Sequence, residues 1–305
     1  MRGHLEALHE QGAEAICALW ASEAGIYGRW GYGPATRAAE LTIDSRDARL
    51  RAPAPERPRG AAPPELLPEI RAVYEAVWHH RPGMVARGDV FWDEAISDFE
   101  HRRTGEGRLR AVVCDGGYAL FAVRSRETEG RPDAVVVLRE LIAATPAAAA
   151  VLWDHLLGLA LTRSVHWALA PADEPLAHMV GDARALRARV ADGLYVRLVD
   201  VARALARRTY AAPVDVVLEL EDPVCPWNAG RRRLAGDASG ATCEPTSAPA
   251  DLALGVTELG AAYLGGTPLA ALAAAGRVEE RTAGALGRAS HALAGVREPW
   301  CAQPF

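Results

Sequence analysis

A strand, a helix and a second strand follow one another in the middle of the sequence, and this order constrains the fold more than any other feature. Residues Ala134 to Ile142 form an apolar, β-branched run that predicts a strand, and a helix follows from about Pro146 to Leu161. The segment "SVHWALA" then predicts another strand. Strands that alternate with helices are typical of an α/β layer.

The flanking segments extend this prediction to a fold of class α/β plus α+β. A helix that ends near Gly12 precedes a buried strand at Ile16 to Trp20, and Ala38 to Asp44 alternates as the next strand of the same unit. Asp115-Gly116-Gly117 between two apolar runs predicts a hairpin. A strand at Asp215 to Asp222, followed by turn-rich loops and then helices, is typical of an α+β region.

The chain of 305 residues is long enough for two or three domains. Residues 51–64 carry repeated prolines and no hydrophobic period, which predicts a linker or a long surface loop. We therefore expect a first domain over residues 1–50, a second over 65–196 and a third over 197–305.

The overall charge argues against a general nucleic-acid binder. The formal net charge is -5 and the isoelectric point is near 6.0, whereas proteins of that class show a basic face and a high isoelectric point. With 50% hydrophobic residues the chain is expected to be globular. Neither the first residues nor any later run has the apolar length of a signal peptide or a membrane span, so we expect a cytoplasmic protein.

The cysteines and histidines give no sign of a disulfide framework or a metal site. The five cysteines are scattered and contain no Cys-x-x-Cys pair. The histidines show no ligand spacing such as i and i+4 on one helix face. We expect a reducing compartment and no bound metal.

The segment "ASEAGIYGRWGYGPAT" at residues 21–36 is the strongest candidate for a site. Its four glycines allow close approach of backbone to a ligand, and its aromatic side chains can be fixed by the tight turns. A glycine-rich turn carrying core aromatics explains the same composition. Tyr32 and Trp30 fit either a pocket lining or core packing, with packing favoured for Trp30.

This segment resembles the signature of the enhanced intracellular survival (Eis) family of GNAT N-acetyltransferases, in which a strand ends in Ala-Ser-Glu and leads into Ile-Tyr-Gly-Arg-aromatic-Gly-Tyr-Gly. The resemblance extends to "GGYALFAVR", "DGLYVRLVDVARALARRTY", "LGAAYLGGTPLAALAAAGRV" and the terminal phenylalanine. It implies an N-terminal GNAT domain, here incomplete, a second GNAT-like domain and a C-terminal sterol-carrier-protein-like domain, assembled as a homo-oligomer, in the family often a hexamer.

The resemblance also implies an activity, acetylation of amines with acetyl-CoA as co-substrate, in some members at several positions of one aminoglycoside. Carried over to this sequence, Tyr27 is the general acid and the terminal carboxylate of Phe305 is the general base. A phenol of pKa about 10 can protonate a leaving thiolate, and an ionised carboxylate can accept a proton from the amine. Frayed chain ends are the ordinary state of a terminus, and this is the alternative for Phe305.

Ser22 and Arg29 are the candidate cofactor-binding residues. Ser22 follows the strand end and lies where the cofactor is expected, although a serine there is also a common cap. GNAT enzymes hold the pyrophosphate of CoA with backbone amides of an Arg-x-x-Gly-x-Gly/Ala loop before this strand, at a helix N-terminus. That loop has no counterpart in "MRGHLEALHEQG".

From this difference we expect the chain to begin partway through a catalytic domain and to bind acetyl-CoA weakly by itself. Two functions remain open. One is an Eis-type N-acetyltransferase that acts on a small-molecule amine, aminoglycoside-like or another polyamine. The alternative is a non-catalytic homologue whose third domain binds lipid or assembles subunits, and lipid extracted from the purified protein would favour it.

Overall fold

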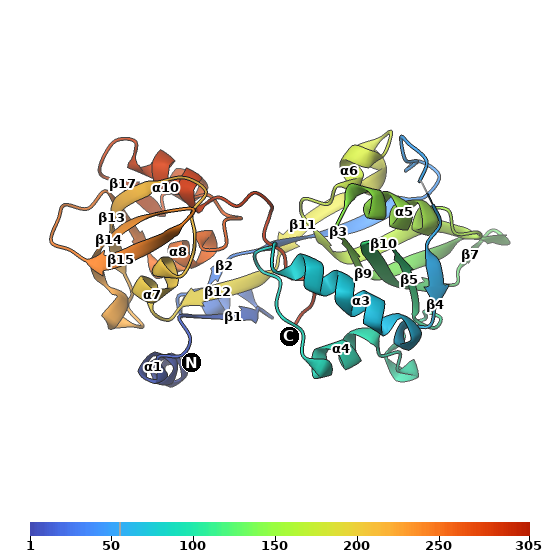
Figure 1. The fold of residues 1–305 in the computed structure, drawn as a ribbon, viewed down its shortest axis with the longest axis horizontal. Helices are drawn as coiled ribbons and strands as arrows, with labels where there is room; N and C mark the ends of the chain where they lie inside the picture. Colours follow the sequence, from blue (N-terminus) through green and yellow to red (C-terminus); the bar gives the residue numbers. More distant parts are fainter. Residues whose placement is uncertain (55) are drawn as a thin grey trace. The chain divides into compact units, whose positions relative to one another are not determined.

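The computed structural model describes residues 1–54 and 56–305, which form two compact units (Figure 1). Unit 1 is built from both ends of the chain, Met1–Arg37 and Asp192–Phe305, and unit 2 is the continuous segment Ala38–Ala191 between them. The mixture of sheets with helices in both units agrees with the predicted α/β plus α+β class.

Unit 1 takes its first elements from the N-terminal segment and the others from the C-terminal part of the chain. In chain order they are α1 (Arg2–Gln11), β1 (Ile16–Trp20), α2 (Ala24–Gly28), β2 (Gly33–Pro34), β12 (Leu194–Leu198), α7 (Val201–Ala206), β13 (Val214–Glu221), β14 (Gly230–Asp237), β15 (Gly240–Pro245), β16 (Leu252–Gly255), α8 (Val256–Ala262), α9 (Leu269–Ala274), β17 (Val278–Glu280) and α10 (Ala285–Leu293).

A three-stranded sheet with the order β1-β12-β2 joins the two ends of the chain. β1 runs antiparallel to β12, with Ile16 opposite Leu198 and Trp20 opposite Leu194. The predicted helix end at Gly12 and strand at Ile16–Trp20 are confirmed, and Gly12 closes α1 with a φ of 62°. The partner of β1 is a strand that only the tertiary fold brings next to it.

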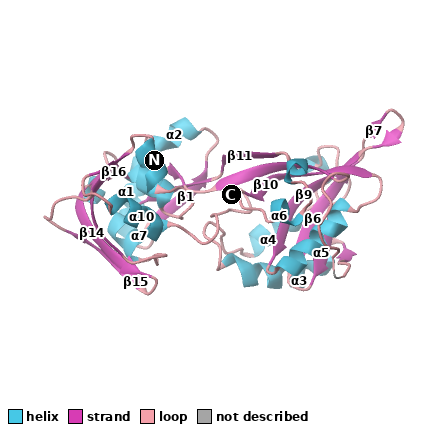
Figure 2. Cartoon of the chain, turned by 90° about the horizontal axis from the view of Figure 1, so that it is seen from above, coloured by secondary structure: helices cyan, strands magenta, loops and turns pink. Residues whose placement is uncertain are grey.

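A five-stranded sheet with the order β15-β14-β13-β16-β17 forms the rest of unit 1. Figure 2 shows α7 and α10 on one side of β14. The core on this side is filled by aliphatic side chains, among them Leu218, Leu234 and Leu252 from the strands and Leu205 and Leu259 from the helices. The predicted strand at 215–222 is confirmed as β13, displaced by one residue.

Unit 2 is a seven-stranded sheet with the order β11-β3-β10-β9-β6-β5-β4 and its helices. In chain order the main elements are β3 (Arg37–Asp44), β4 (Arg59–Ala61), α3 (Pro63–Trp78), α4 (Asp89–Ile96), β5 (Arg110–Cys114), β6 (Gly117–Arg124), β7 (Glu127–Thr128), β8 (Arg131–Pro132), β9 (Ala134–Ala143), α5 (Pro146–Leu157), β10 (Thr162–Pro171), α6 (Leu176–Met179) and β11 (Ala188–Asp192).

The strand, helix and strand that opened the sequence analysis are confirmed as β9, α5 and β10. β9 and β10 are parallel neighbours, and the Thr145 hydroxyl accepts the amide N–H of Ala148 at the start of α5. The helix ends at Leu157 and not at Leu161, because Gly158 follows and Leu161 has a φ of 65°, outside the helical region. The hairpin is also confirmed, with Gly116 in the turn at a φ of 70°.

Two expectations about the beginning of the chain differ from the structure. The strand at 38–44 does not continue the sheet of Ile16–Trp20 but pairs with β10 in unit 2. The proline-rich segment 51–64 does not separate two units, since residues 59–61 form β4 and pair with β5 inside unit 2. Pro55 of this segment lies outside the described residues. The predicted limits at 50, 64 and 196 therefore do not coincide with those of the two units.

Unit 2 buries an ion pair in its core. The Arg87 guanidinium donates through Nη1 to Glu140 Oε1 at 3.0 Å and through Nη2 to Oε2 of the same carboxylate. The Tyr118 hydroxyl also donates to Glu140, and Arg87 lies over the Tyr74 ring with 4.1 Å between its Cζ and the ring centroid. Every oxygen of the buried carboxylate is therefore satisfied.

A second acid in unit 2, Glu174, is half-buried and accepts hydrogen bonds from uncharged groups. Glu174 Oε1 accepts the indole N–H of Trp153 at 3.0 Å and the amide N–H of Leu176 at 3.3 Å. Burial raises the pKa of Glu174 to about 7, because the charged form loses its hydration. The folded chain therefore holds a proton on Glu174 at pH values where the unfolded chain releases it.

We predict that Glu174→Gln stabilises the protein at pH 8 but changes its stability much less at pH 5. Because the folded chain binds the Glu174 proton more tightly than the unfolded chain, this proton stabilises the fold fully below about pH 4.5. The stabilisation is lost as the pH rises to about 7. Glutamine keeps the acceptor for Trp153 and removes this loss, so the gain in unfolding free energy between the two pH values is about 1–2 kcal/mol. Urea unfolding measures it, with the exposed Glu127→Gln as control. An equal effect of Glu174→Gln at both pH values would contradict the assignment.

The sheet of β1, β12 and β2 approaches α8 at two glycines. A Cβ on Gly33 would overlap the carbonyl oxygen of Thr257 and the amide nitrogen of Ala261, and a Cβ on Gly260 would lie 2.5 Å from the carbonyl oxygen of Val196. Backbone atoms, which cannot turn aside, form all of these contacts. The close approach of the two segments therefore requires glycine at both positions.

We predict that Gly33→Ala destabilises the protein by about 2–3 kcal/mol, the cost of overpacking against backbone. Gly25→Ala is the matched control, because a Cβ there meets nothing within 4 Å. Urea unfolding of both variants gives the comparison. Equal stability of the two variants would show that β2 can move away from α8 without cost.

Candidate functional site

The glycine-rich segment 21–36 lies entirely in unit 1 and follows β1 directly. Ser22 is exposed just after the strand, as the sequence predicts, and α2 then carries Tyr27 at its penultimate position. Four residues, 29–32, connect α2 with β2. The segment therefore presents a short helix and a turn at the end of a strand, supported by β12 and α8.

Tyr27 is held by its backbone and by one ring contact. Its carbonyl oxygen accepts the amide N–H of Trp30 at 2.9 Å and that of Tyr32 at 3.3 Å, which ties both ends of the turn to it. Its half-buried ring meets the Tyr32 ring edge to face, with 6.1 Å between centroids. Within residues 1–54 and 56–305 the Tyr27 hydroxyl has no hydrogen-bond partner. It is therefore available to a bound molecule.

Tyr32 is a packing residue, as one of the two sequence interpretations has it. Its side chain is 3% exposed, and its hydroxyl lies 3.1 Å from the Cys17 thiol. Burial raises the pKa of Tyr32 and that of Cys17. Both groups therefore stay protonated at neutral pH. The buried Tyr32 ring packs against the Tyr27 ring and restricts its position.

Arg29 lies on the surface beside a small cavity. Its Nε donates to the carbonyl oxygen of Ile26 at 3.1 Å, which leaves the terminal nitrogens of the exposed guanidinium for other partners. The cavity has a volume of about 110 Å³ and is lined by Gly28, Arg29 and Gly31 on one side, and by the segments 221–224 and 255–257 on the other. Sites for whole ligands are typically about 300–1,000 Å³, so this cavity can hold only a small group or water.

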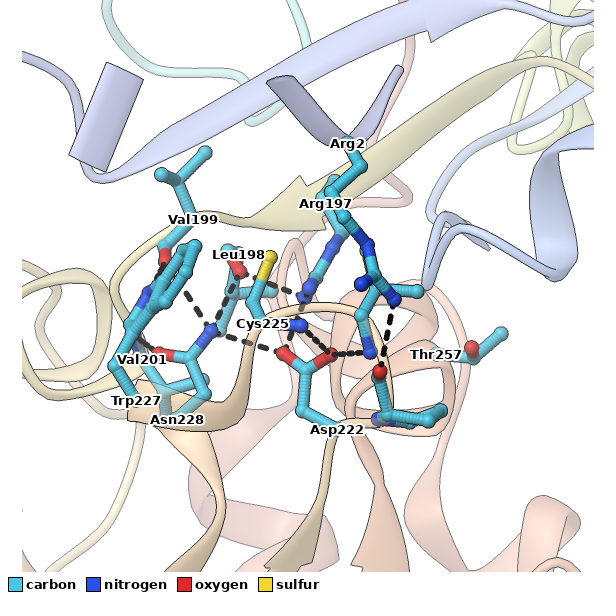
Figure 3. Close-up of polar contacts among 12 residues, drawn as sticks. Arg2, Arg197, Leu198, Val199, Val201, Asp222, Cys225, Trp227, Asn228 and Thr257 are labelled. Carbon is cyan, nitrogen blue, oxygen red and sulfur yellow. Dashed lines mark hydrogen bonds and ion pairs between the residues drawn. The ribbon is translucent and has the colours of Figure 1, made fainter. Parts of the chain in front are cut away.

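A buried ion pair lies beneath the turn, and the sequence analysis missed it. Arg197 on β12 and Asp222 after β13 are both 0% exposed, and Arg197 Nη2 donates to Asp222 Oδ2 at 2.7 Å. Figure 3 shows the two side chains pointing toward each other, with Asn228 donating to the same carboxylate. The available signal was the arginine inside the apolar run "LYVRLV", where a charge must find a buried partner.

Phe305 lies at the end of the described chain, 51% exposed. Trp300, Cys301 and Ala302 just before it are buried, and the Cys301 thiol donates to the carbonyl oxygen of Gln303 at 3.2 Å. Among the residues that the structure describes, no hydrogen bond or ring contact joins Phe305 to Tyr27. Ser22, Tyr27 and Arg29 therefore lie on one segment, whereas Phe305 belongs to another part of the chain.

All five cysteines are free. In the described part of the chain, no three or more His, Cys, Asp and Glu side chains lie close enough together to hold a metal ion. No helix among the same residues is both long and apolar enough to cross a membrane.

Comparison with known proteins identifies the family. Residues 83–198 match the acetyltransferase (GNAT) domain family, and residues 201–302 match the sterol carrier protein domain family. An uncharacterised N-acetyltransferase of Streptomyces coelicolor is 46% identical over 100% of this chain and 76% of its own length. The chain is therefore related to GNAT N-acetyltransferases.

Two further relatives carry the Eis name. The N-acetyltransferase Eis of Mycobacterium tuberculosis is 35% identical over 96% of this chain and 73% of its own length. The crystal structure of an Eis protein from Mycobacterium abscessus, 30% identical, superposes on 100% of this chain and 76% of that protein with a TM-score of 0.84. The chain belongs to the Eis family of GNAT N-acetyltransferases. The resemblance stated from the sequence motifs is confirmed, and with it the N-acetyltransferase class of the enzyme.

The two matched domains also bear on the site. Residues 22–29 lie outside both of them, whereas Arg197 belongs to the GNAT match and Asp222 to the sterol-carrier match. The GNAT match extends through β12, the strand that pairs with β1. The buried ion pair therefore joins the two matched domains within unit 1.

Proposed function

We propose that this Eis-family enzyme transfers the acetyl group of acetyl-CoA to an amine of a small polyamine, such as an aminoglycoside, with Tyr27 as general acid. The observation that carries the proposal is the hydroxyl of Tyr27, which is half-buried, without a protein partner in the described chain, and fixed at the end of β1 by the turn and by Tyr32. The family membership supplies the reaction class.

The reaction needs one proton donor and one proton acceptor. The amine nitrogen attacks the thioester carbonyl carbon, the carbon–sulfur bond breaks, and the electron pair leaves with the CoA sulfur. Tyr27 donates its phenolic proton to that sulfur. The proton lost by the attacking nitrogen goes to a base, and the phenol recovers its own from solvent, so the cycle closes.

The carboxylate that Phe305 carries as the last residue of the printed sequence is our proposed base. An α-carboxyl group has a pKa of about 3.3–3.7 in model peptides and is ionised at neutral pH. The exposure of Phe305 leaves its carboxylate accessible to a substrate amine. With the Phe305 carboxylate as proton acceptor, the reaction does not require a carboxylate side chain from segment 21–36.

Ser22 and Arg29 are the proposed contacts of acetyl-CoA. Both are exposed on the segment that carries Tyr27, and the guanidinium of Arg29 keeps its terminal nitrogens for an anionic partner such as a phosphate. A polyamine acceptor agrees with the formal charge of -5, which attracts cations over a distance of about one Debye length. By family resemblance we also propose that the chain forms a homo-oligomer, a hexamer.

We predict that Tyr27→Phe lowers kcat by about 100-fold or more with little change in the KM of the amine, because the lost proton transfer occurs in the transition state. Tyr32→Phe is the matched control, since the Tyr32 hydroxyl is buried against Cys17. Release of free CoA thiol under saturating acetyl-CoA measures both. A kcat that falls equally in the two variants would assign the effect to packing of the turn.

We predict that a short extension after Phe305 abolishes turnover and leaves the fold intact. An intein fusion gives a sharper comparison, because hydrolysis of its thioester leaves the Phe305 carboxylate and ammonolysis leaves the uncharged carboxamide. The carboxamide should lower kcat by about 100-fold. Equal rates of the two forms would remove Phe305 from the mechanism and leave Tyr27 untouched.

The lipid-binding alternative has its own measurement. Organic extraction of the purified protein followed by mass spectrometry detects a retained lipid. Lipid in near-equimolar amount, together with no CoA release for a panel of polyamines, would favour that alternative over acetyl transfer by this chain.

A further inference from the structure

The guanidinium of Arg197 fills the space that a side chain at Gly31 would occupy. A Cβ on Gly31 would lie 2.9 Å from Arg197 Cζ and Nε and 2.8 Å from Val256 Cγ1. Gly31 has a φ of 83°, in the left-handed region that favours glycine. The turn after Tyr27 therefore rests directly on the Arg197 guanidinium.

Arg197 is fixed from its other side. Nη2 donates to Asp222 Oδ2 at 2.7 Å and Nη1 to the carbonyl oxygen of Leu198 at 2.8 Å. Asp222 is itself held in place, because its Oδ1 accepts the amide N–H groups of Val224 at 3.2 Å and Cys225 at 2.9 Å. The planar guanidinium consequently has one orientation available to it.

Short backbone hydrogen bonds link Gly31, which contacts Arg197, to Tyr27. The amide N–H of Gly31 donates to the carbonyl oxygen of Gly28 at 3.0 Å, and those of Trp30 and Tyr32, on either side of Gly31, both donate to the carbonyl oxygen of Tyr27. A displacement of Gly31 therefore changes the direction of the Tyr27 side chain.

We propose that Arg197 is a positioning residue, which with Asp222 fixes the turn at Gly31 and thereby aims the Tyr27 hydroxyl at the reacting thioester. This inference rests on the proposed role of Tyr27 as general acid. Arg197 itself touches no substrate, since it is 0% exposed beneath the turn.

The buried ion pair of unit 2 serves as a control. It distinguishes an effect on the position of Tyr27 from a general effect of altering a buried ion pair. Arg87 and Glu140 form an ion pair that is likewise buried, but Arg87 lies over the rings of Tyr74 and Trp92 and not under a glycine turn. Arginine and lysine differ in that only arginine offers a planar fork. Arg197→Lys keeps the charge opposite Asp222 and removes the plane under Gly31, and Arg87→Lys makes the same change in the comparison pair.

The experiment measures kcat, the KM of the amine, and amide hydrogen exchange of residues 24–33 in both lysine variants. We expect Arg197→Lys to lower kcat by about 10-fold to 100-fold with KM within about twofold, as expected for a misplaced catalytic group. Exchange in residues 24–33 should become faster, because the turn loses its support. Arg87→Lys should change neither. Gly31→Ala displaces the same contact from the opposite side and should lower kcat likewise, so a folding defect of Arg197→Lys does not end the test.

A double-mutant cycle with Tyr27→Phe decides whether Arg197 acts through Tyr27. In the Tyr27→Phe background Arg197→Lys should cause no further loss of kcat. The same fold loss in both backgrounds, or unchanged exchange of residues 24–33 in Arg197→Lys, would overturn the inference. If Tyr27→Phe alone leaves kcat unchanged, the proposed acid is refuted, and the exchange measurement still decides whether Arg197 fixes the turn.

Discussion

The antiparallel pairing of Ile16–Trp20 with Leu194–Leu198 is the interaction on which the rest of unit 1 depends. It places the end of β1, and hence the segment with Ser22, Tyr27 and Arg29, beside the strand that carries Arg197. It also sets Cys17 opposite Arg197 in register, so that the Cys17 thiol and the Tyr32 hydroxyl meet above the same strand. Without this pairing the glycine-rich segment would not be held against β12.

Each unit buries an arginine in an ion pair, and the two arginines have different surroundings. Arg87 in unit 2 lies over aromatic rings, and its partner carboxylate, that of Glu140, also accepts the Tyr118 hydroxyl. Arg197 in unit 1 lies between the end of β13 and a turn, and it donates to one backbone carbonyl, that of Leu198, and to the Asp222 carboxylate. A buried ion pair gives little net stability, because desolvation offsets attraction. The hydrogen bonds of the two terminal nitrogens of Arg197 fix its orientation, although its Nε has no hydrogen-bond partner among the described residues.

Local signals explain which parts of the fold the sequence predicts. The end of α1 at Gly12, the strand Ile16–Trp20 and the hairpin at Gly116 each depend on a few neighbouring residues, and all three are confirmed. The neighbours of β3 depend on contacts far along the chain, and the sequence assigns them wrongly. For the site, the motif identifies the segment with Tyr27, whereas Arg197 requires knowing that residues 197 and 222 meet, which no local pattern encodes.

The division of unit 1 between the two ends of the chain has a consequence for biosynthesis. Unit 2 is continuous, so all of its strands are synthesised before β12. During that time β1 lacks its partner strand β12. The helix α8, against which Gly33 packs, begins only at Val256 and is therefore made later still. Domains generally fold as units during synthesis, N-terminal parts first, but here residues 1–37 belong to the unit that is completed after unit 2. Until β12 is made, β1 therefore presents unpaired strand edges, which are prone to wrong pairing with other strands.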